Sequence, residues 1–511
     1  MHGLLSFFNG TSGRSSHYGG HGAWIVLAFS IALTLPCLVF RYLPMVDLPQ
    51  HEAIVSMMLQ LHNRKFGFDS YYSWAPTRTL YIAPYALAVV LARLMSLRFA
   101  MHAVVFCAVI AYPVGILLCL RALGRPAHLG LLAMPLVYNQ SFFWGFINFN
   151  FAIGLAFITL ALLIGNWSRR RALSVVLLSI LVSFTHVYGL ILLGLYVGLW
   201  FAFGERRLAS KRLVAMIPAG MALILWLYLL SRAHGFSEYK WRGLFNRWSR
   251  LPESIAGGWR DHTEVLVLCG LGVAIGALSC RTAPVTTTRW KKLSGHQRVI
   301  WAFIGLNLLL YFGMPELSIA ANKASFRHAE IAALALPLTL NHEEAGAAPN
   351  WARLFLVGLA FCVVVLSWYH FTRFDKEARS FDAIIDAVPE RSRIAQLTYD
   401  RHGQVARAPV YLHFAAYAQA DKGGFLAVSF PAQFWNIPMT VRSDVALPLI
   451  PQGLEWNPLL FGNSRLGEYF DYVIVRASRN RRLSLPQPFP YQLQLQNGSW
   501  WLLRRYESSH E

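Results

Sequence analysis

The feature that most restricts the fold of this chain is a series of apolar runs before residue 372. An α-helix needs about 20 apolar residues to cross the hydrocarbon core of a bilayer. Of the 511 residues, 56% are hydrophobic and only 14% are charged, which excludes an ordinary soluble protein. The candidate runs lie at about 23–43, 79–97, 99–120, 128–141, 147–166, 172–186, 188–203, 212–231, 263–280, 298–315, 326–341 and 352–371. We therefore predict a polytopic α-helical membrane protein with about 11 to 13 transmembrane helices, in contact with the lipid bilayer.

Basic clusters between these runs indicate the orientation of the chain. The formal net charge is +21, and excess Lys and Arg in such proteins usually lies in short cytoplasmic loops, so no nucleic-acid partner is predicted. The clusters lie at 121–128, 167–171, 205–212 and 281–298. With these loops inside, the tail 1–22 is cytoplasmic, and the loops 44–78 and 232–261 are external. The segment 79–120 must then cross an odd number of times, so one of its two runs is expected to be short, tilted or re-entrant.

The composition changes after the last apolar run, which predicts a transmembrane domain over 23–371 and a separate α/β domain over 372–511. "FDAIIDAVP" and "VYLHFAAYAQADKGG" indicate helices, the second ended by glycine. "RIAQLTY", "FLAVSF" and "DYVIV" indicate strands, and "YQLQLQNGSWWLL" a hairpin around Asn497 and Gly498. With an odd number of crossings, this domain is periplasmic or extracellular, on the outer side of the inner (plasma) membrane.

The stretch "PMVDLPQHEAIVSMMLQLHN", which begins at Pro44, places polar residues directly after the first span. Pro49 suits a first helical turn with Asp47 or Leu48 near the cap, and the following residues form an apolar side. We expect this helix to lie along the membrane interface, with its polar start facing a cavity. Asp47 and His51 are four residues apart and can share a face, whereas Glu52 lies one position off it. The alternative is that Asp47 only caps the helix and His51 is solvated.

A first external loop that starts D-x-P-x-H after the first span and continues as an amphipathic helix resembles the GT-C superfamily of integral membrane glycosyltransferases. That superfamily includes protein O-mannosyltransferases and lipid A aminoarabinose transferases. Many short helices, Trp-rich external loops, the segment "GFINFNFAIG" and a domain outside the membrane are similar features. The resemblance implies a polyprenyl-phosphate-linked sugar donor and an acidic residue of this loop at the catalytic centre. The adjacent acidic pair of mannosyltransferases is absent, because Leu48 follows Asp47.

Transfer from such a donor by direct displacement needs a carboxylate that takes the acceptor proton and cations that stabilise the leaving phosphate. Asp47 is the candidate base, with His51 or Glu52 orienting it or holding a divalent metal ion, whose requirement stays open. The cations are sought in "MPELSIAANKASFRHAEIAALALPL", where Lys323, Arg327 and Glu330 would share one stripe of a helix. The alternative is that Arg327 pairs with Glu330 and Lys323 extends to the membrane surface.

Other polar residues in or beside the spans are further candidates for substrate binding. Glu316 could reach the same cavity, although a solvated loop acid is the commoner role. His186, in "SFTHVYGL", could bind phosphate or metal, but a hydrogen-bonded packing residue is the commoner case. Asn148 and Asn150 could contact sugar, yet bridges between helices explain them at least as well.

The sequence therefore predicts an inverting GT-C-type glycosyltransferase that acts on the external face. Its acceptor is an envelope polysaccharide, a lipid or a protein. A transporter or flippase of lipid-linked saccharides is one alternative, although no internal repeat is visible. A non-catalytic membrane scaffold of envelope polysaccharide synthesis is another.

Overall fold

The computed structural model describes residues 18–231, 241, 243–279, 293–318, 321–340, 350–462, 465–478 and 490–506. Most of the predicted cytoplasmic tail, the start of the loop 232–261 and much of the basic loop 281–298 lie outside these residues. The rest of the 232–261 loop contains a helix that the sequence analysis did not predict, α12 (Leu244–Ala256).

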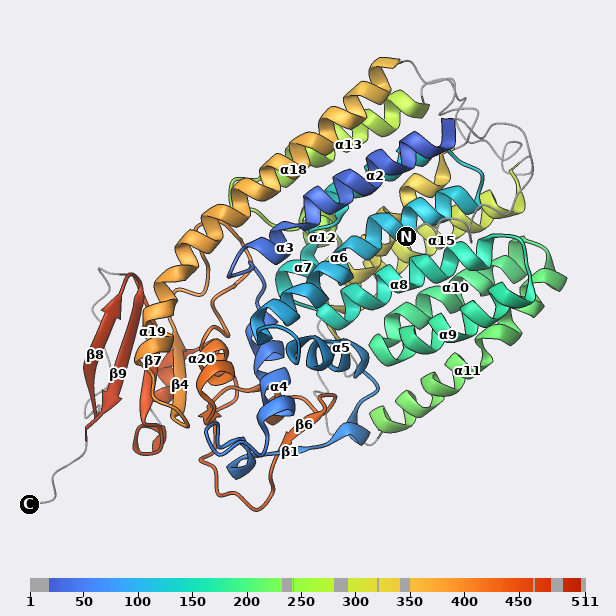
Figure 1. The fold of residues 1–511 in the computed structure, drawn as a ribbon. Helices are drawn as coiled ribbons and strands as arrows, with labels where there is room; N and C mark the ends of the chain where they lie inside the picture. Colours follow the sequence, from blue (N-terminus) through green and yellow to red (C-terminus); the bar gives the residue numbers. More distant parts are fainter. Residues whose placement is uncertain are drawn as a thin grey trace, which may run out of the picture.

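Every predicted apolar run coincides with helical structure, which confirms a polytopic α-helical membrane protein with a C-terminal region that contains β-sheet (Figure 1). Within the described ranges, five segments are long and apolar enough to cross a membrane by themselves. They lie within α2–α3 (Tyr18–Thr34 and Pro36–Val39), α6 (Leu97–Ala122), α8 (Ile147–Ile164), α11 (Arg206–Ser231) and α18 with its extension (Asn350–Ala378, continuing to Ala387). The other helices at predicted runs are α5 (Ala83–Ala92), η3 (Ala127–Leu136), α9 (Arg169–Thr185), α10 (Val187–Phe203), α13 (Thr263–Ser279), α15 (Gly295–Gly313), and α16 with η4 (Ala324–Ala335 and Leu336–Thr339).

The first helix of the 79–120 segment is the short one that the charge pattern requires. The helix α5 has 10 residues, against 26 in α6, and about 20 are needed for a straight crossing. The total number of crossings stays a prediction, because η3 and α16 are similarly short, with 10 and 12 residues.

Close packing of α6 against α8 forms the centre of the bundle. A Cβ atom added at Gly115 of α6 would lie 2.7 Å from the Cβ of Phe157 on α8. The absence of a side chain at such a position lets two helix backbones approach closely, as is common in membranes. The hydroxyl of Tyr112 also donates a hydrogen bond of 2.9 Å to Oδ1 of Asn150. Asn150 therefore bridges two helices, as one of the two interpretations of its sequence position predicts.

The C-terminal region is built on a five-stranded mixed sheet in the order β5-β4-β7-β9-β8. The strands are β4 (Arg393–Thr398), β5 (Phe425–Leu426), β7 (Tyr472–Arg476), β8 (Tyr491–Asn497) and β9 (Trp500–Arg505). β4 pairs in parallel with β5 and β7, and β9 is antiparallel to β7 and β8. The predicted hairpin at Asn497 and Gly498 is confirmed. The helices α19 (Asp382–Ala387) and α20 (Ala415–Lys422) also match, and Gly423 ends α20 with a φ of +78°.

The helix that follows Asp47, α4 (Leu48–Gln60), lies between the transmembrane helices and the C-terminal region (Figure 1). The Ser56 hydroxyl donates a hydrogen bond of 2.6 Å to the carbonyl of Ala420 in α20. The Gln50 side chain donates to the carbonyl of Val428 and accepts from the amide of Phe430. All residues from Leu48 to Met57 are buried. The C-terminal region therefore covers the first ten residues of α4, and the place of this helix along the membrane interface stays a prediction.

A second contact joins the same parts of the chain. The strand β1 (Tyr72–Trp74), from the 44–78 loop, pairs antiparallel with β6 (Met439–Val441) of the C-terminal region. The loop and the C-terminal region therefore lie on the same side of the bundle.

Candidate functional site

Asp47 sits at the start of α4, and its position is fixed through the backbone. Its amide donates a hydrogen bond of 3.1 Å to the carbonyl of Trp144, and the amide of Val46 donates to the carbonyl of Phe143. The Asp47 side chain makes no capping hydrogen bond to α4, and the residue is only 9% exposed. The alternative that Asp47 merely caps the helix is thus excluded, and its carboxylate is available for another contact.

That contact comes from the C-terminal region. Nδ1 of His413 lies 3.1 Å from Oδ1 of Asp47, and Nε2 of His413 lies 3.3 Å from Oε2 of Glu455. The imidazole is 7% exposed and is placed between the two carboxylates. Burial lowers the pKa of His413, but the nearby carboxylates of Asp47 and Glu455 outweigh burial and raise that pKa to about 9. His413 is therefore an imidazolium at neutral pH.

His51 turns to a different partner. Its Nδ1 lies 2.7 Å from the hydroxyl of Tyr85 on α5. His51 is buried, which excludes the alternative of a solvated histidine. Burial lowers its pKa to about 4, although the Asp47 charge raises it. His51 is thus a neutral imidazole that links α4 to α5, and Asn148 lies in the first turn of α8.

Glu52 is fully buried and forms part of an ion network. Its Oε1 lies 3.1 Å from Nε of Arg98 on α6, and NH2 of Arg98 lies 3.2 Å from Asp421. The guanidinium carbon of Arg98 also lies 5.3 Å from the ring centre of Tyr42 and 4.6 Å from that of Tyr417. Burial raises the pKa of Glu52 to about 7, and Arg98 opposes that rise. Glu52 therefore ties α4 to α6 and, through Arg98, to the C-terminal region.

The side chains of Asp47, His51 and Glu52 have three different partners, which are His413, Tyr85 and Arg98. Among the described residues, no group of three or more His, Cys, Asp or Glu side chains is arranged to hold a metal ion. The suggestion that His51 or Glu52 binds a metal finds no support in this part of the chain.

The predicted cations lie on the other side of a short turn between α7 (Gln140–Trp144) and α8. Nζ of Lys323 lies 3.1 Å from the ring centre of Trp144. The guanidinium carbon of Arg327 lies 4.6 Å from the ring centre of Phe146, and 4.9 and 5.2 Å from those of Phe149 and Tyr188. Arg327 is 5% exposed, so its charge is held inside an aromatic cage.

The helical stripe that the sequence predicts is only partly formed. Arg327 and Glu330 lie on α16, but Lys323 precedes the helix in a left-handed conformation with a φ of +57°. Oε1 of Glu330 accepts a hydrogen bond of 2.8 Å from the amide of Ser141 in α7. The two cations and the acid therefore all contact the segment from α7 to the start of α8.

Gly145 connects the two halves of the site. It has a φ of +80°, and a Cβ atom at this position would lie 2.7 Å from the amide nitrogen of Asp47. Only glycine combines this conformation with so close an approach. Each residue of the turn Trp144–Gly145–Phe146 thus has one contact in the site. Gly145 lies against the Asp47 backbone. The ring of Trp144 contacts Lys323, and that of Phe146 contacts Arg327.

Two other candidates have roles that the structure defines. His186 precedes α10, where its Nδ1 accepts a hydrogen bond of 3.1 Å from the amide of Tyr188. Its ring stacks on Tyr81 at 4.5 Å. His186 is therefore a hydrogen-bonded packing residue, the commoner of its two interpretations, and it stands next to the Arg327 cage through Tyr188.

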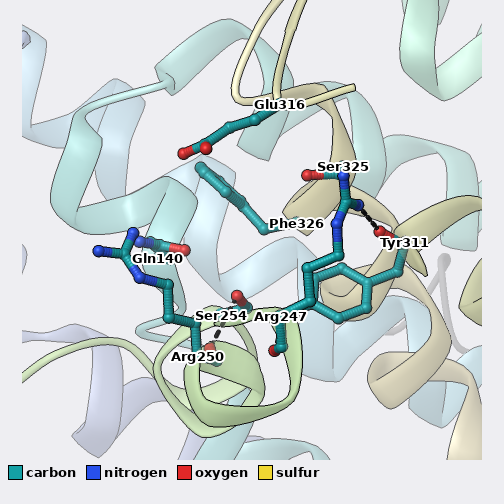
Figure 2. Close-up of a pocket in the computed structure, with 8 residues that line it drawn as sticks. All are labelled: Gln140, Arg247, Arg250, Ser254, Tyr311, Glu316, Ser325 and Phe326. Atoms are coloured by element: carbon teal, nitrogen blue, oxygen red, sulfur yellow. Dashed lines mark hydrogen bonds between the residues drawn. The ribbon is translucent and has the colours of Figure 1, made fainter. Parts of the chain in front are cut away.

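Glu316 lines a small cavity of about 30 Å³ between α12, α15 and the start of α16 (Figure 2). The guanidinium of Arg247 extends into this region and donates hydrogen bonds to the carbonyls of Tyr311 and Met314. The complete lining is Gln140, Arg247, Arg250, Ser254, Tyr311, Glu316, Ser325 and Phe326. Asp47 and Arg327 do not line this cavity, and a cavity that Glu316 shares with them stays a prediction.

His413, Glu455 and Arg98 are the functional candidates that the sequence analysis missed. His413 lies in the predicted helical stretch "VYLHFAAYAQADKGG", where it is a single polar residue among apolar ones. No spacing in the sequence relates it to Asp47, because their contact depends on how the C-terminal region docks on α4.

No protein-family model and no curated protein matches this chain. Two solved structures of ArnT from Cupriavidus metallidurans match almost all of it. The structure bound to undecaprenyl phosphate is 12% identical, has a TM-score of 0.45, and covers 95% of this chain and 98% of the ArnT chain. The apo structure is 13% identical, has a TM-score of 0.41, and covers 94% and 97%.

Proposed function

We propose that this protein is a GT-C-type membrane glycosyltransferase, which moves a sugar from a polyprenyl-phosphate-linked donor to an acceptor hydroxyl or amine. The observation that carries the proposal is the turn Trp144–Gly145–Phe146. It supports the backbone of Asp47 on one side and holds Lys323 and Arg327 against its aromatic rings on the other. The backbone of the candidate base and the two cations thus contact the same three-residue turn.

This arrangement suits a direct displacement. The acceptor heteroatom attacks the anomeric carbon of the donor while its proton passes to the Asp47 carboxylate. The bond from the anomeric carbon to the phosphate oxygen breaks, and polyprenyl phosphate leaves with the bonding electron pair. Lys323 and Arg327 stabilise the charge that develops on this phosphate. The attack and the departure occur on opposite sides of the anomeric carbon, so the configuration there is inverted.

The aromatic cage suits the second of these roles. Three rings around Arg327 reduce its contact with water, and a charge in such surroundings interacts more strongly with an anion than it would in solution. An arginine also presents two parallel N–H groups to a phosphate, which fixes the orientation of that phosphate.

We place the reaction on the external face. The basic loops at 167–171 and 205–212 favour the cytoplasm. The register that follows from them puts the 44–78 loop, and the C-terminal region that covers it, outside. The acceptor is then an envelope polysaccharide, a lipid or a protein.

The test is an Asp47→Asn variant of the full-length protein, purified and placed in lipid nanodiscs. The substrates are a panel of undecaprenyl-phosphate-linked hexoses and aminoarabinose, with membranes of the native host as the source of acceptor. The measurement is the release of undecaprenyl phosphate by mass spectrometry. We expect a loss of at least about 100-fold, the usual contribution of a general base.

The matched control is Asp444→Asn, which removes an exposed carboxylate that pairs with Arg442. We expect this variant to turn over at the rate of the unaltered protein. Full activity of Asp47→Asn would contradict the proposed function.

A further inference from the structure

We propose that His413 and Glu455 position the Asp47 carboxylate, so that the C-terminal region completes the site in the transmembrane part of the chain. The inference rests on the proposed function, in which Asp47 is the base. It assigns to the C-terminal region a direct part in the reaction rather than a supporting one.

The geometry is that of a chain of three side chains from separate segments. Asp47 precedes α4, His413 precedes α20, and Glu455 lies in the connection between β6 and β7. Each nitrogen of the imidazole faces one carboxylate, at 3.1 Å and 3.3 Å. Nε2 is hydrogen-bonded to Glu455 and Nδ1 lies within ion-pair distance of Asp47, so two carboxylates flank the ring and favour the imidazolium.

The ring of Phe430 packs against both His413 and His51, the second histidine of the site. The ring of Phe430 meets His413 edge-on at 5.5 Å and His51 edge-on at 5.8 Å. The amide of Phe430 donates a hydrogen bond to the side chain of Gln50, which holds Phe430 against α4. The two histidines therefore have different partners and, with pKa values of about 9 and about 4, different charges.

Other charges near His413 support the same protonation state. The titratable groups that act on it are Asp47 and Glu455, which favour the imidazolium, and the neutral His51 on the far side of Phe430. Burial raises the pKa of Glu455, but its contact with His413 outweighs burial and holds that pKa below its usual range. Glu455 therefore remains an anion near neutral pH and balances the charge of the imidazolium.

The consequence for Asp47 is orientation. With Oδ1 held by the imidazolium, the carboxylate has one preferred rotation and presents Oδ2 to the acceptor. A base held in the productive geometry reacts faster than one that rotates freely. His413 does not touch the reacting atoms in this scheme, so it is a positioning residue, and Glu455 positions His413 in turn.

Docking of the C-terminal region does not depend on this one contact. Gln50, Ser56 and the β1–β6 pair hold it to the 44–78 loop, and Arg41 pairs with Asp382 at 2.9 Å. Removal of the His413 side chain should therefore leave the protein folded.

The experiment measures kcat and KM for the undecaprenyl-phosphate-linked sugar that the panel identifies, from pH 6 to pH 10. The variants are His413→Gln, Glu455→Gln and the double variant. The control His402→Gln changes an exposed histidine of the same region, whose Nδ1 lies 2.7 Å from the carbonyl of Arg407. We expect His413→Gln to lower kcat by about 10- to 100-fold with little change in KM.

Glu455→Gln provides a readout that a purely structural role would not change. Without the Glu455 charge the pKa of His413 falls, so the loss of activity on the alkaline side should begin at a lower pH than in the unaltered protein. The double variant should resemble His413→Gln alone, since Glu455 acts only through His413. A normal kcat in His413→Gln, or an unshifted alkaline limb in Glu455→Gln, would overturn the inference.

The Asp47→Asn result distinguishes a failure of the positioning role from a failure of the proposed function. If Asp47→Asn is inactive and both His413→Gln and Glu455→Gln behave like the unaltered protein, only the positioning role fails. If Asp47→Asn is active, the proposed function fails with it.

Discussion

Gly145 lies so close to Asp47 that any other residue at this position would displace the candidate base. A Cβ atom at 145 would come within 2.7 Å of the Asp47 nitrogen and 3.0 Å of the Leu48 nitrogen. The turn between α7 and α8 and the start of α4 are therefore fitted to each other, backbone against backbone.

We expect Gly145→Ala to reduce turnover severely, because the start of α4 must move away from the turn. Gly124→Ala is the matched control. Gly124 also has a positive φ, +67°, but no heavy atom lies within 4 Å of its added Cβ. Gly124→Ala should lower the free energy of unfolding by only about 1 kcal/mol, the cost of a non-glycine residue at a positive φ. Thermal unfolding and turnover of both variants provide the comparison, and equal losses in the two would show that the contact with Asp47 is unimportant.

Arg327→Gln should weaken the binding of undecaprenyl phosphate by about 10-fold or more, because a charged hydrogen bond to phosphate is lost. Arg327→Lys keeps the charge but not the two parallel donors, so its affinity for undecaprenyl phosphate should lie between that of Arg327→Gln and that of the unaltered protein. Quenching of tryptophan fluorescence by added undecaprenyl phosphate is a suitable measurement. The control Arg373→Gln removes an exposed arginine that lies over Tyr369. Unaltered affinity in Arg327→Gln would exclude Arg327 from phosphate binding.

The buried pair of Glu52 and Arg98 should matter more for folding than an exposed pair. Glu52→Gln removes one of the two carboxylates that pair with Arg98, and because Asp421 remains, we expect a loss below about 3–5 kcal/mol, the cost of a fully unpaired buried charge. Asp444→Asn breaks an exposed pair, for which about 0–1 kcal/mol is expected. The midpoint of thermal unfolding in detergent distinguishes these cases. Similar small shifts in both variants would mean that α4 does not depend on its ion network.

The charge of His413 also predicts how stability depends on pH. Its pKa in the folded protein is about 9, above the unfolded value of about 6.5. The stabilisation is therefore fully present below pH about 6.5 and is lost as the pH rises through about 9. The melting temperature should fall over this range by more in the unaltered protein than in His413→Gln. Parallel pH curves for the two proteins would argue against a charged His413.

Local features of the sequence predicted most of the fold. Apolar runs give helices because every backbone polar group must be paired inside the membrane, and Asn497 with Gly498 gives a hairpin because that pair adopts the required turn. Asp47 could be recognised because it directly follows the first span. The amphipathic pattern of α4 could not show that α20 packs against it, because that contact depends on how the distant C-terminal region docks.

The partners in the site depend on contacts between distant segments, which sequence spacing does not reveal. Arg327 and Lys323 were found from their positions beside a span, but the rings of Trp144 and Phe146 that hold them come from a different helix pair. His413 was missed for the same reason, since a single histidine before a helix carries no signal of its own.

The most direct test of the proposed function measures turnover and lipid binding in the same Asp47→Asn preparation. We predict that this variant binds undecaprenyl phosphate as the unaltered protein does, because Lys323 and Arg327 are unchanged, and releases almost none from the lipid-linked sugar. Normal release of undecaprenyl phosphate by Asp47→Asn would contradict the assignment of Asp47 as the base.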